Sequence, residues 1–204
     1  EMTSSLVGSE MCIRDSLFRV MAKKILILNG SPRKRGNTSG LIQAFTEGAE
    51  ESGNIVTSFF LDSMNIHECK GCFGGGKNSD SPCIQKDDMD KIYPVYEQAD
   101  VIVLASPMYY WSITGQLKCT FDRLFAVAEK DPGYRNPKKD CIMLMAAEGN
   151  SKSNNEPVEA YYNSLLKHLG WNNRGLLIAG GVTAIGDIKD HTSLERVKDL
   201  GISI

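Results

Sequence analysis

Short apolar runs alternate along the chain with segments in which apolar residues recur every three or four positions. The runs are typical of buried β-strands, and the periodic segments are typical of amphipathic helices. The apolar runs lie at 24–29, 55–61, 101–105, 142–146 and 175–180. The segments with helical periodicity lie at 38–52, 89–96, 116–130, 158–169 and 194–200. Apolar strands separated by helices predict a parallel sheet covered on both faces, and therefore an α/β fold.

The alternating pattern begins at Met21, and we expect one domain over residues 21–204. Residues 1–20 do not continue the pattern, and they lack the positive start and continuous apolar centre of a signal peptide. The stretch SSLVGSEMCIRDS within them resembles translated sequencing-adapter sequence. We therefore interpret residues 1–20 as a non-domain extension and an artefact, and expect truncation to Met21 to preserve the fold.

Composition narrows the class of protein. The 204 residues are 42% hydrophobic and 24% charged, which is ordinary for a soluble globular domain. A net charge of −2 argues against a nucleic-acid partner. No apolar run approaches the roughly 20 residues that a membrane-spanning helix needs. With no secretory segment before the domain, we expect a cytoplasmic protein with reduced thiols and no membrane contact.

The loop after the first apolar run reads GSPRKRGNTS, from Gly30 to Ser39, and leads directly into a helix. The free amides and the dipole of a helix N-terminus favour an anion such as phosphate. The loop adds side-chain donors that could bind the same anion, namely Ser31, Arg33, Asn37, Thr38 and Ser39. It is not a Walker A motif, because no Gly-Lys-Ser/Thr ends it. The alternative is an ordinary basic loop between a strand and a helix.

Two further loops follow strands that should end at the same edge of the sheet. The loop after the third run, 106–114, holds three successive aromatic residues that cannot all point into the core. They indicate a surface for a flat ligand, with free backbone amides for its polar edge, or alternatively a subunit contact. The loop after the fourth run, 146–150, is built from small residues that allow close approach to a ring.

The motifs GSPRxxGNTS and SPxYxxSxxGQLKxxxDR resemble those of the flavodoxin-like NAD(P)H-dependent FMN reductase family, especially the branch that contains the iron–sulfur flavoproteins. The later segment Gly186-Asp187-Ile188-Lys189 is also similar to that family. The resemblance extends from Met21 to Ile204. It implies a three-layer, flavodoxin-like doubly wound fold, with a five-stranded parallel sheet of order 2-1-3-4-5 and bound FMN.

The resemblance also implies roles for individual residues. The ribityl phosphate would be held by Ser31, Arg33, Asn37, Thr38 and Ser39. The isoalloxazine ring would be bordered by Pro107, Met108, Tyr109, Tyr110, Trp111 and Ser112. The other edge of the ring would be closed by Ala147, Glu148 and Gly149.

The implied activity passes electrons from NAD(P)H through FMN to a small acceptor such as a quinone or a nitroaromatic. Flavin carries this chemistry, so no side chain is assigned as a catalytic acid or base. The resemblance further suggests a homodimer in which the aromatic residues of one subunit lie near the flavin of the other. Two alternatives remain, a flavodoxin-type electron carrier and a non-catalytic flavin redox sensor. The first is disfavoured because such carriers are usually strongly acidic.

The iron–sulfur branch of this family has a pattern that resembles Cys-x2-Cys-x2-Cys followed by a fourth cysteine. The cysteines at 69, 72 and 83 depart from that pattern. Gly75 stands at the third position. A cubane cluster takes four thiolates, so we predict no cluster and no bound metal. Three interpretations stay open: a structural or substrate-covering loop, a redox-active Cys-x-x-Cys pair, and a zinc site completed by His67.

Overall fold

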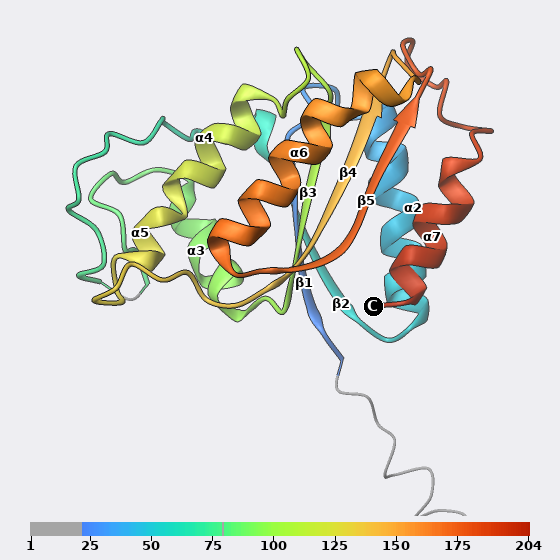
Figure 1. The fold of residues 1–204 in the computed structure, drawn as a ribbon. Helices are drawn as coiled ribbons and strands as arrows, with labels where there is room; N and C mark the ends of the chain where they lie inside the picture. Colours follow the sequence, from blue (N-terminus) through green and yellow to red (C-terminus); the bar gives the residue numbers. More distant parts are fainter. Residues whose placement is uncertain (1–21, 79) are drawn as a thin grey trace, which may run out of the picture.

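The computed structural model describes residues 22–78 and 80–204 and contains a central five-stranded sheet (Figure 1). The predicted extension over residues 1–20 lies outside the described residues. The strands are β1 Lys24–Asn29, β2 Ile55–Phe60, β3 Val101–Pro107, β4 Asp140–Ala147 and β5 Asn172–Gly180. They lie in the order β2-β1-β3-β4-β5, and every neighbouring pair is parallel. The predicted flavodoxin-like fold and strand order are confirmed.

Successive side chains of the central strands point to opposite faces of the sheet, and both faces are buried. In β1, Leu26 and Leu28 pack on one face, whereas Ile25 and Ile27 pack on the other. The same alternation in β3 and β4 places Leu104 and Met143 in the first core and Val103 and Ile142 in the second. Two buried faces explain why these strands are apolar at every position rather than at every second one.

Helices cover the two faces of the sheet in separate layers (Figure 1). The first core is covered by α3 Met89–Gln98, α4 Gly115–Arg123, α5 Phe125–Ala128 and α6 Lys152–Leu169. The second core is covered by α2 Asn37–Glu51 and α7 Ser193–Ile202. These last two helices touch through glycines, because a Cβ on Gly48 would lie 2.1 Å from the Lys198 carbonyl oxygen. Their close packing fixes the helix that carries the predicted phosphate loop.

The observed elements differ from the expected ones mainly at their ends. The third, fourth and fifth strands are longer than their apolar runs, since backbone pairing continues into polar residues. Residue 61 begins a short 3-10 turn, η1 Leu61–Ser63. The helix predicted over 116–130 is divided at Leu124, where the amide bonds the Phe121 carbonyl at 3.1 Å in a tighter turn. The Arg123 carbonyl accepts the Tyr93 hydroxyl at 3.2 Å at the same point.

Among residues 22–78 and 80–204, no helix combines the length and the apolar character that crossing a bilayer requires.

Candidate functional site

The loops that follow β1, β3 and β4 meet at one edge of the sheet, as parallel strands require. Backbone hydrogen bonds continue beyond the strands. The Gly30 amide donates to the Ala105 carbonyl and the Met108 amide donates to the Ala146 carbonyl, both at 2.8 Å. Between the loops lies a cavity of about 680 Å³, here called the loop cavity. It is lined by Ser31, Arg33, Gly36, Asn37, Thr38, Pro107, Met108, Tyr109, Ala146, Glu148, Val182 and Thr183.

The N-terminus of α2 opens into the loop cavity. Gly36 occupies the N-cap position with extended backbone and supplies no side chain to the first helical turn. Within the described part of the chain, the amides of Asn37 and Thr38 have no acceptor. The Thr38 hydroxyl lines the same cavity, although Thr38 is only 2% exposed. Unpaired amides at a helix N-terminus, with a hydroxyl beside them, are suited to binding an anion.

The other side chains of the phosphate loop are already used within the loop. The Ser31 hydroxyl accepts from the Arg33 amide at 3.1 Å and donates to the Arg33 carbonyl at 3.2 Å. The Ser39 hydroxyl donates to the same carbonyl at 3.4 Å. The Arg33 guanidinium is exposed and donates to the Thr183 carbonyl at 3.4 Å. Four of the five predicted phosphate residues line the loop cavity; Ser39 is not among its lining residues.

Asn37 connects the phosphate loop to the segment before α7. Its side-chain amide donates to the Ala184 carbonyl at 2.9 Å. Its side-chain oxygen accepts from the amides of Gly186 and Ile188 at 3.2 and 3.4 Å. Because both ends of the side chain are engaged, Asn37 orients this segment with its side chain and faces the cavity with its backbone amide.

Sequence reasoning missed that residues 182 and 183 line the loop cavity. Asp187 holds this segment in place, since its carboxylate accepts from the amides of Thr183 and Ala184 at 2.9 and 2.7 Å. The resemblance singled out Gly186–Lys189 but assigned the segment no role. The signal that could have found it is the Gly180-Gly181 pair at the end of β5, which marks the start of a loop at the same edge of the sheet.

The loop of residues 106–114, here called the aromatic loop, contains a tight two-residue turn. The amides and carbonyls of Tyr109 and Ser112 bond each other, both at 3.0 Å. The central residues Tyr110 and Trp111 both have positive φ, 47° and 58°. This is the conformation that normally selects Asn-Gly or Gly-Gly, so two large aromatic side chains hold a strained position. Tyr110 is 94% exposed.

Within the described residues, the amides of Tyr110 and Trp111 have no partner, as expected for this loop. The expectation is wrong for Tyr109 and Ser112, whose amides pair across the turn, and for Met108 and Thr114, whose amides bond the Ala146 carbonyl and the Ser106 hydroxyl. Of the six predicted ring residues, three line the loop cavity, namely Pro107, Met108 and Tyr109. Ser112 is absent from the lining of both this cavity and the one described next.

A second cavity, here called the aromatic cavity, adjoins the first and has a volume of about 820 Å³. Its lining consists of Met108, Tyr110, Trp111, Ala147, Glu148, Gly149 and Asn154. Met108 and Glu148 line both cavities, so the two adjoin at these residues. Asn154, which the sequence did not single out, packs so closely that a Cβ on Gly149 would lie 2.6 Å from its side chain. The third predicted loop is therefore part of the same site.

The comparisons with known proteins agree with this geometry. Residues 23–184 match the model of a family described as NADPH-dependent FMN reductase. The chain belongs to this family. An iron–sulfur flavoprotein of Archaeoglobus fulgidus is 33% identical over 175 residues, which are 86% of this chain and 76% of that protein. An iron–sulfur flavoprotein of Methanosarcina thermophila is 36% identical over 113 residues, 55% of this chain and 58% of that protein.

The fold of this reductase also agrees with a solved structure, an NAD(P)H:quinone oxidoreductase from Methanothermobacter marburgensis. The TM-score is 0.70 at 19% identity, and the match covers 89% of this chain and 96% of the other. The reductase is an NAD(P)H-dependent FMN oxidoreductase.

The residues of the reductase fit FMN. A phosphate needs donors that have no other partner, and the amides of Asn37 and Thr38 are such donors. A flat ring needs an adjoining apolar surface, which Met108, Tyr110 and Trp111 supply. Both requirements are met in two adjoining cavities, as a ligand with a phosphate at one end and a ring at the other needs.

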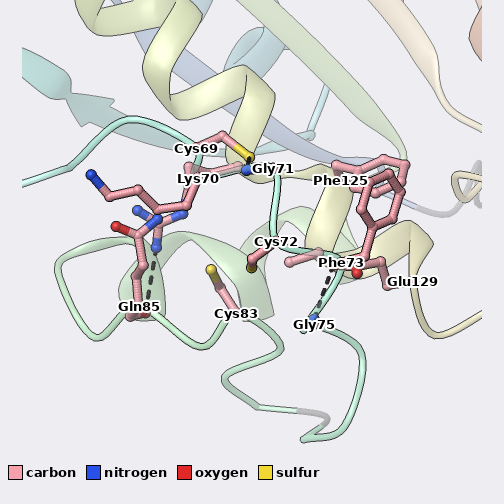
Figure 2. A pocket seen from close by; sticks show the side chains of 12 residues that line it. Cys69, Lys70, Gly71, Cys72, Phe73, Gly75, Cys83, Gln85, Phe125 and Glu129 are labelled. Atoms are coloured by element: carbon pink, nitrogen blue, oxygen red, sulfur yellow. Dashed lines mark hydrogen bonds between the residues drawn. The ribbon is translucent and has the colours of Figure 1, made fainter.

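The cysteine loop lies apart from these two cavities and lines a separate one with Phe73, Phe125 and Glu129 (Figure 2). Cys69 and Cys72 are exposed and Cys83 is buried, and all three are free thiols. Their cavity shares no lining residue with the loop cavity or the aromatic cavity.

A buried ion pair fixes the base of the cysteine loop. The Arg123 guanidinium bonds both carboxylate oxygens of Asp87, at 2.7 and 3.2 Å, and donates to the His67 carbonyl at 2.9 Å. The Asp87 side chain is 0% exposed. Burial raises the pKa of Asp87, but hydrogen bonds from Arg123 and from the amides of His67 and Met89 outweigh it and hold that pKa below its usual value. The pair therefore stays ionised inside the protein.

Proposed function

We propose that this reductase binds FMN across the loop cavity and the aromatic cavity, and that it passes electrons from NAD(P)H to a small quinone or nitroaromatic. The observation that carries the proposal is that the two cavities adjoin and share Met108 and Glu148 in their linings. An unpaired helix N-terminus lies at one end of this space, and exposed aromatic side chains lie at the other.

The phosphate end of the site depends on the first turn of α2. The amides of Asn37 and Thr38 and the Thr38 hydroxyl would donate to the phosphate, and Arg33 would add positive charge. The helix dipole contributes only about 0.3–1 kcal/mol at an exposed site. Each charge-assisted hydrogen bond contributes about 1.5–3 kcal/mol, so the donors supply most of the affinity. Ser31, Ser39 and the Asn37 side chain keep the loop in the conformation that presents them.

At the other end, bound FMN would supply hydride and electron transfer. Pro107, Met108 and Tyr109 would border the ring, and Ala147, Glu148 and Gly149 would close its other edge. Tyr110 and Trp111 would give a nicotinamide or an aromatic acceptor a flat apolar surface beside the ring. These residues position the reactants, and none is assigned as an acid or a base.

The exposed aromatic residues also support a homodimer. Tyr109, Tyr110 and Trp111 are 48%, 94% and 54% exposed. A cluster of large exposed aromatic side chains is typical of a protein contact. A second copy of the chain covering this turn would exclude water from the ring. A cytoplasmic location is part of the same proposal, and the free thiols of the described cysteines support it.

Steady-state oxidation of NADH and NADPH by the FMN-loaded protein tests the proposal, with a benzoquinone and a nitrobenzene as acceptors. We expect turnover far above that of free FMN at equal concentration, and parallel-line kinetics with either acceptor. Turnover no faster than free FMN would contradict the proposal and favour an electron carrier or a flavin sensor. A protein that retains no FMN would remove the assignment of the two cavities.

A further inference from the structure

The pocket around the cysteine loop, here called the cysteine pocket, has a volume of about 480 Å³. Cys69, Cys72 and Cys83 line it together with apolar side chains that include Phe73 and Phe125 (Figure 2). The rings of Phe73 and Phe125 meet edge to face, with centroids 5.8 Å apart. Relatives of this chain are named iron–sulfur flavoproteins. Three cysteines around one pocket raise the question of whether this chain can hold such a cluster.

The side chains do not form a complete set of ligands. A cubane cluster takes four cysteine thiolates, and the fourth thiolate is missing because residue 75 is glycine. Among the residues that the structure describes, no three His, Cys, Asp or Glu side chains are grouped so that they could hold a metal ion. Cys83 is only 9% exposed, whereas Cys69 and Cys72 lie at the surface of the loop.

The place of a side chain at position 75 is taken by Glu129. The Gly75 amide donates to Glu129 Oε2 at 3.1 Å, the contact drawn as a dashed line in Figure 2. A Cβ on Gly75 would lie 2.2 Å from that oxygen and 3.2 Å from the Ala126 Cα. The carboxylate thus closes this corner of the pocket and adds a negative charge beside three potential thiolates.

The neighbouring residue, Gly76, also lies against Glu129. Gly76 has a φ of 78°, and a Cβ there would lie 2.5 Å from the Glu129 carbonyl oxygen. The backbone of residues 75 and 76 therefore lies directly against the end of α5. A cysteine at position 75 therefore requires the end of the flexible Glu129 side chain to move aside.

We propose that this chain does not carry the iron–sulfur cluster for which its relatives are named, because Gly75 removes one thiolate and Glu129 occupies the space it would need. The cysteine pocket is then a metal-free apolar pocket that exposes two thiols. Electrons in this reductase pass between the nicotinamide, FMN and the acceptor without a second redox centre.

The test is anaerobic reconstitution of the full chain with ferrous iron and sulfide, followed by assay of protein-bound iron, acid-labile sulfide and FMN. EPR spectra of the dithionite-reduced samples identify a cluster independently of activity. We expect FMN but no iron above the level bound by a Cys69→Ser/Cys72→Ser control. Gly75→Cys alone should take up less iron and sulfide than the double variant below, because the Glu129 carboxylate must first move aside. The double variant Gly75→Cys/Glu129→Ala should take up about four iron and four sulfide per chain, the content of one cubane cluster.

Each opposite result overturns part of the proposal. Stoichiometric iron and sulfide in the unmodified chain would overturn it outright, and their loss in Glu129→Ala would make Glu129 a ligand. Equal uptake by Gly75→Cys and the double variant would refute the blocking role of Glu129. A double variant that retains FMN but gains no cluster would refute position 75 as the missing ligand.

Discussion

The hydroxyl of Thr114 donates a 2.8 Å hydrogen bond to the carbonyl of Gly30, although 84 residues separate them. The same hydroxyl caps α4 by accepting from the Leu117 amide at 3.4 Å. The Thr114 amide donates to the Ser106 hydroxyl at 3.0 Å. One buried threonine therefore fixes the phosphate loop and the aromatic loop relative to each other, and with them the two ends of the proposed flavin site.

Replacing Thr114 by valine should remove both hydroxyl contacts while keeping the shape of the side chain. The Gly30 carbonyl would lose its buried hydrogen-bond donor, and α4 would lose its N-terminal cap. We therefore expect the free energy of unfolding to fall by about 2–3 kcal/mol. Affinity for FMN should fall as well, because the loops lose their common contact. Urea denaturation and fluorescence titration of apoprotein with FMN measure the two effects. Thr114→Ser is the matched control, and a serine variant as impaired as the valine one would contradict the role of the hydroxyl.

Removing the phosphate donors should weaken FMN binding without unfolding the protein. Thr38→Ala removes an unengaged hydroxyl and Arg33→Ala an exposed cation, and each should cost about 1.5–3 kcal/mol of binding if it contacts the phosphate. Arg35→Ala is the matched control, since Arg35 is an exposed cation in the same loop that does not line the cavity. Apoprotein titrations with FMN and with riboflavin, which lacks the phosphate, check the result. Equal losses for both ligands would remove these residues from the phosphate site.

Relieving the strained turn should stabilise the protein at the expense of activity. Each residue held at positive φ costs on the order of 1–3 kcal/mol when it is not glycine. Tyr110→Asn/Trp111→Gly introduces the sequence that this turn prefers, so we expect a higher melting temperature. The same change removes the aromatic surface beside the ring, so kcat/KM for NAD(P)H and for the acceptor should fall. Scanning calorimetry and steady-state kinetics measure both, and a less stable variant would contradict the strain.

The buried pair of Asp87 and Arg123 should give the protein a distinct sensitivity to acid. The pKa of Asp87 is held below its usual 3.8. The ionised carboxylate therefore stabilises the folded protein at pH values above 3.8, and this stabilisation is lost as the pH falls below 3.8. Asp87→Asn should lower the free energy of unfolding by about 3–5 kcal/mol near pH 7, since it leaves Arg123 buried without its counter-ion.

Urea denaturation from pH 7 down to pH 3 tests this prediction. The difference between the parent chain and Asp87→Asn should shrink as the pH approaches 3. Asp131→Asn serves as the control, because its partner Arg135 is 79% exposed and an exposed ion pair adds little to stability. A difference that stays constant over the whole pH range would show that the stabilisation does not come from ionised Asp87.

The sequence by itself determined the layers of the fold, and it predicted which loops form the proposed site. Residues 25–28 and 101–105 are apolar at every position, a local pattern that is typical of strands in a sheet buried on both faces. The loop from Gly30 to Ser39 joins such a strand to a helix, so its anion site could be inferred from neighbours in the chain. These properties depend on backbone periodicity and on contacts within a few residues, which the order of amino acids contains directly.

Only the tertiary structure decided which hydrogen-bond donors of the loops have a partner, and which side chain lies beside each loop. The Asn37 side chain binds residues about 150 positions away, and Glu129 binds the amide of Gly75, 54 residues earlier. The mutual bonds of Tyr109 and Ser112 depend on two aromatic residues taking a conformation that their own preferences oppose. The physical reason is the same in each case: a polar group bonds whatever the fold brings beside it, and no periodicity in the sequence records that partner.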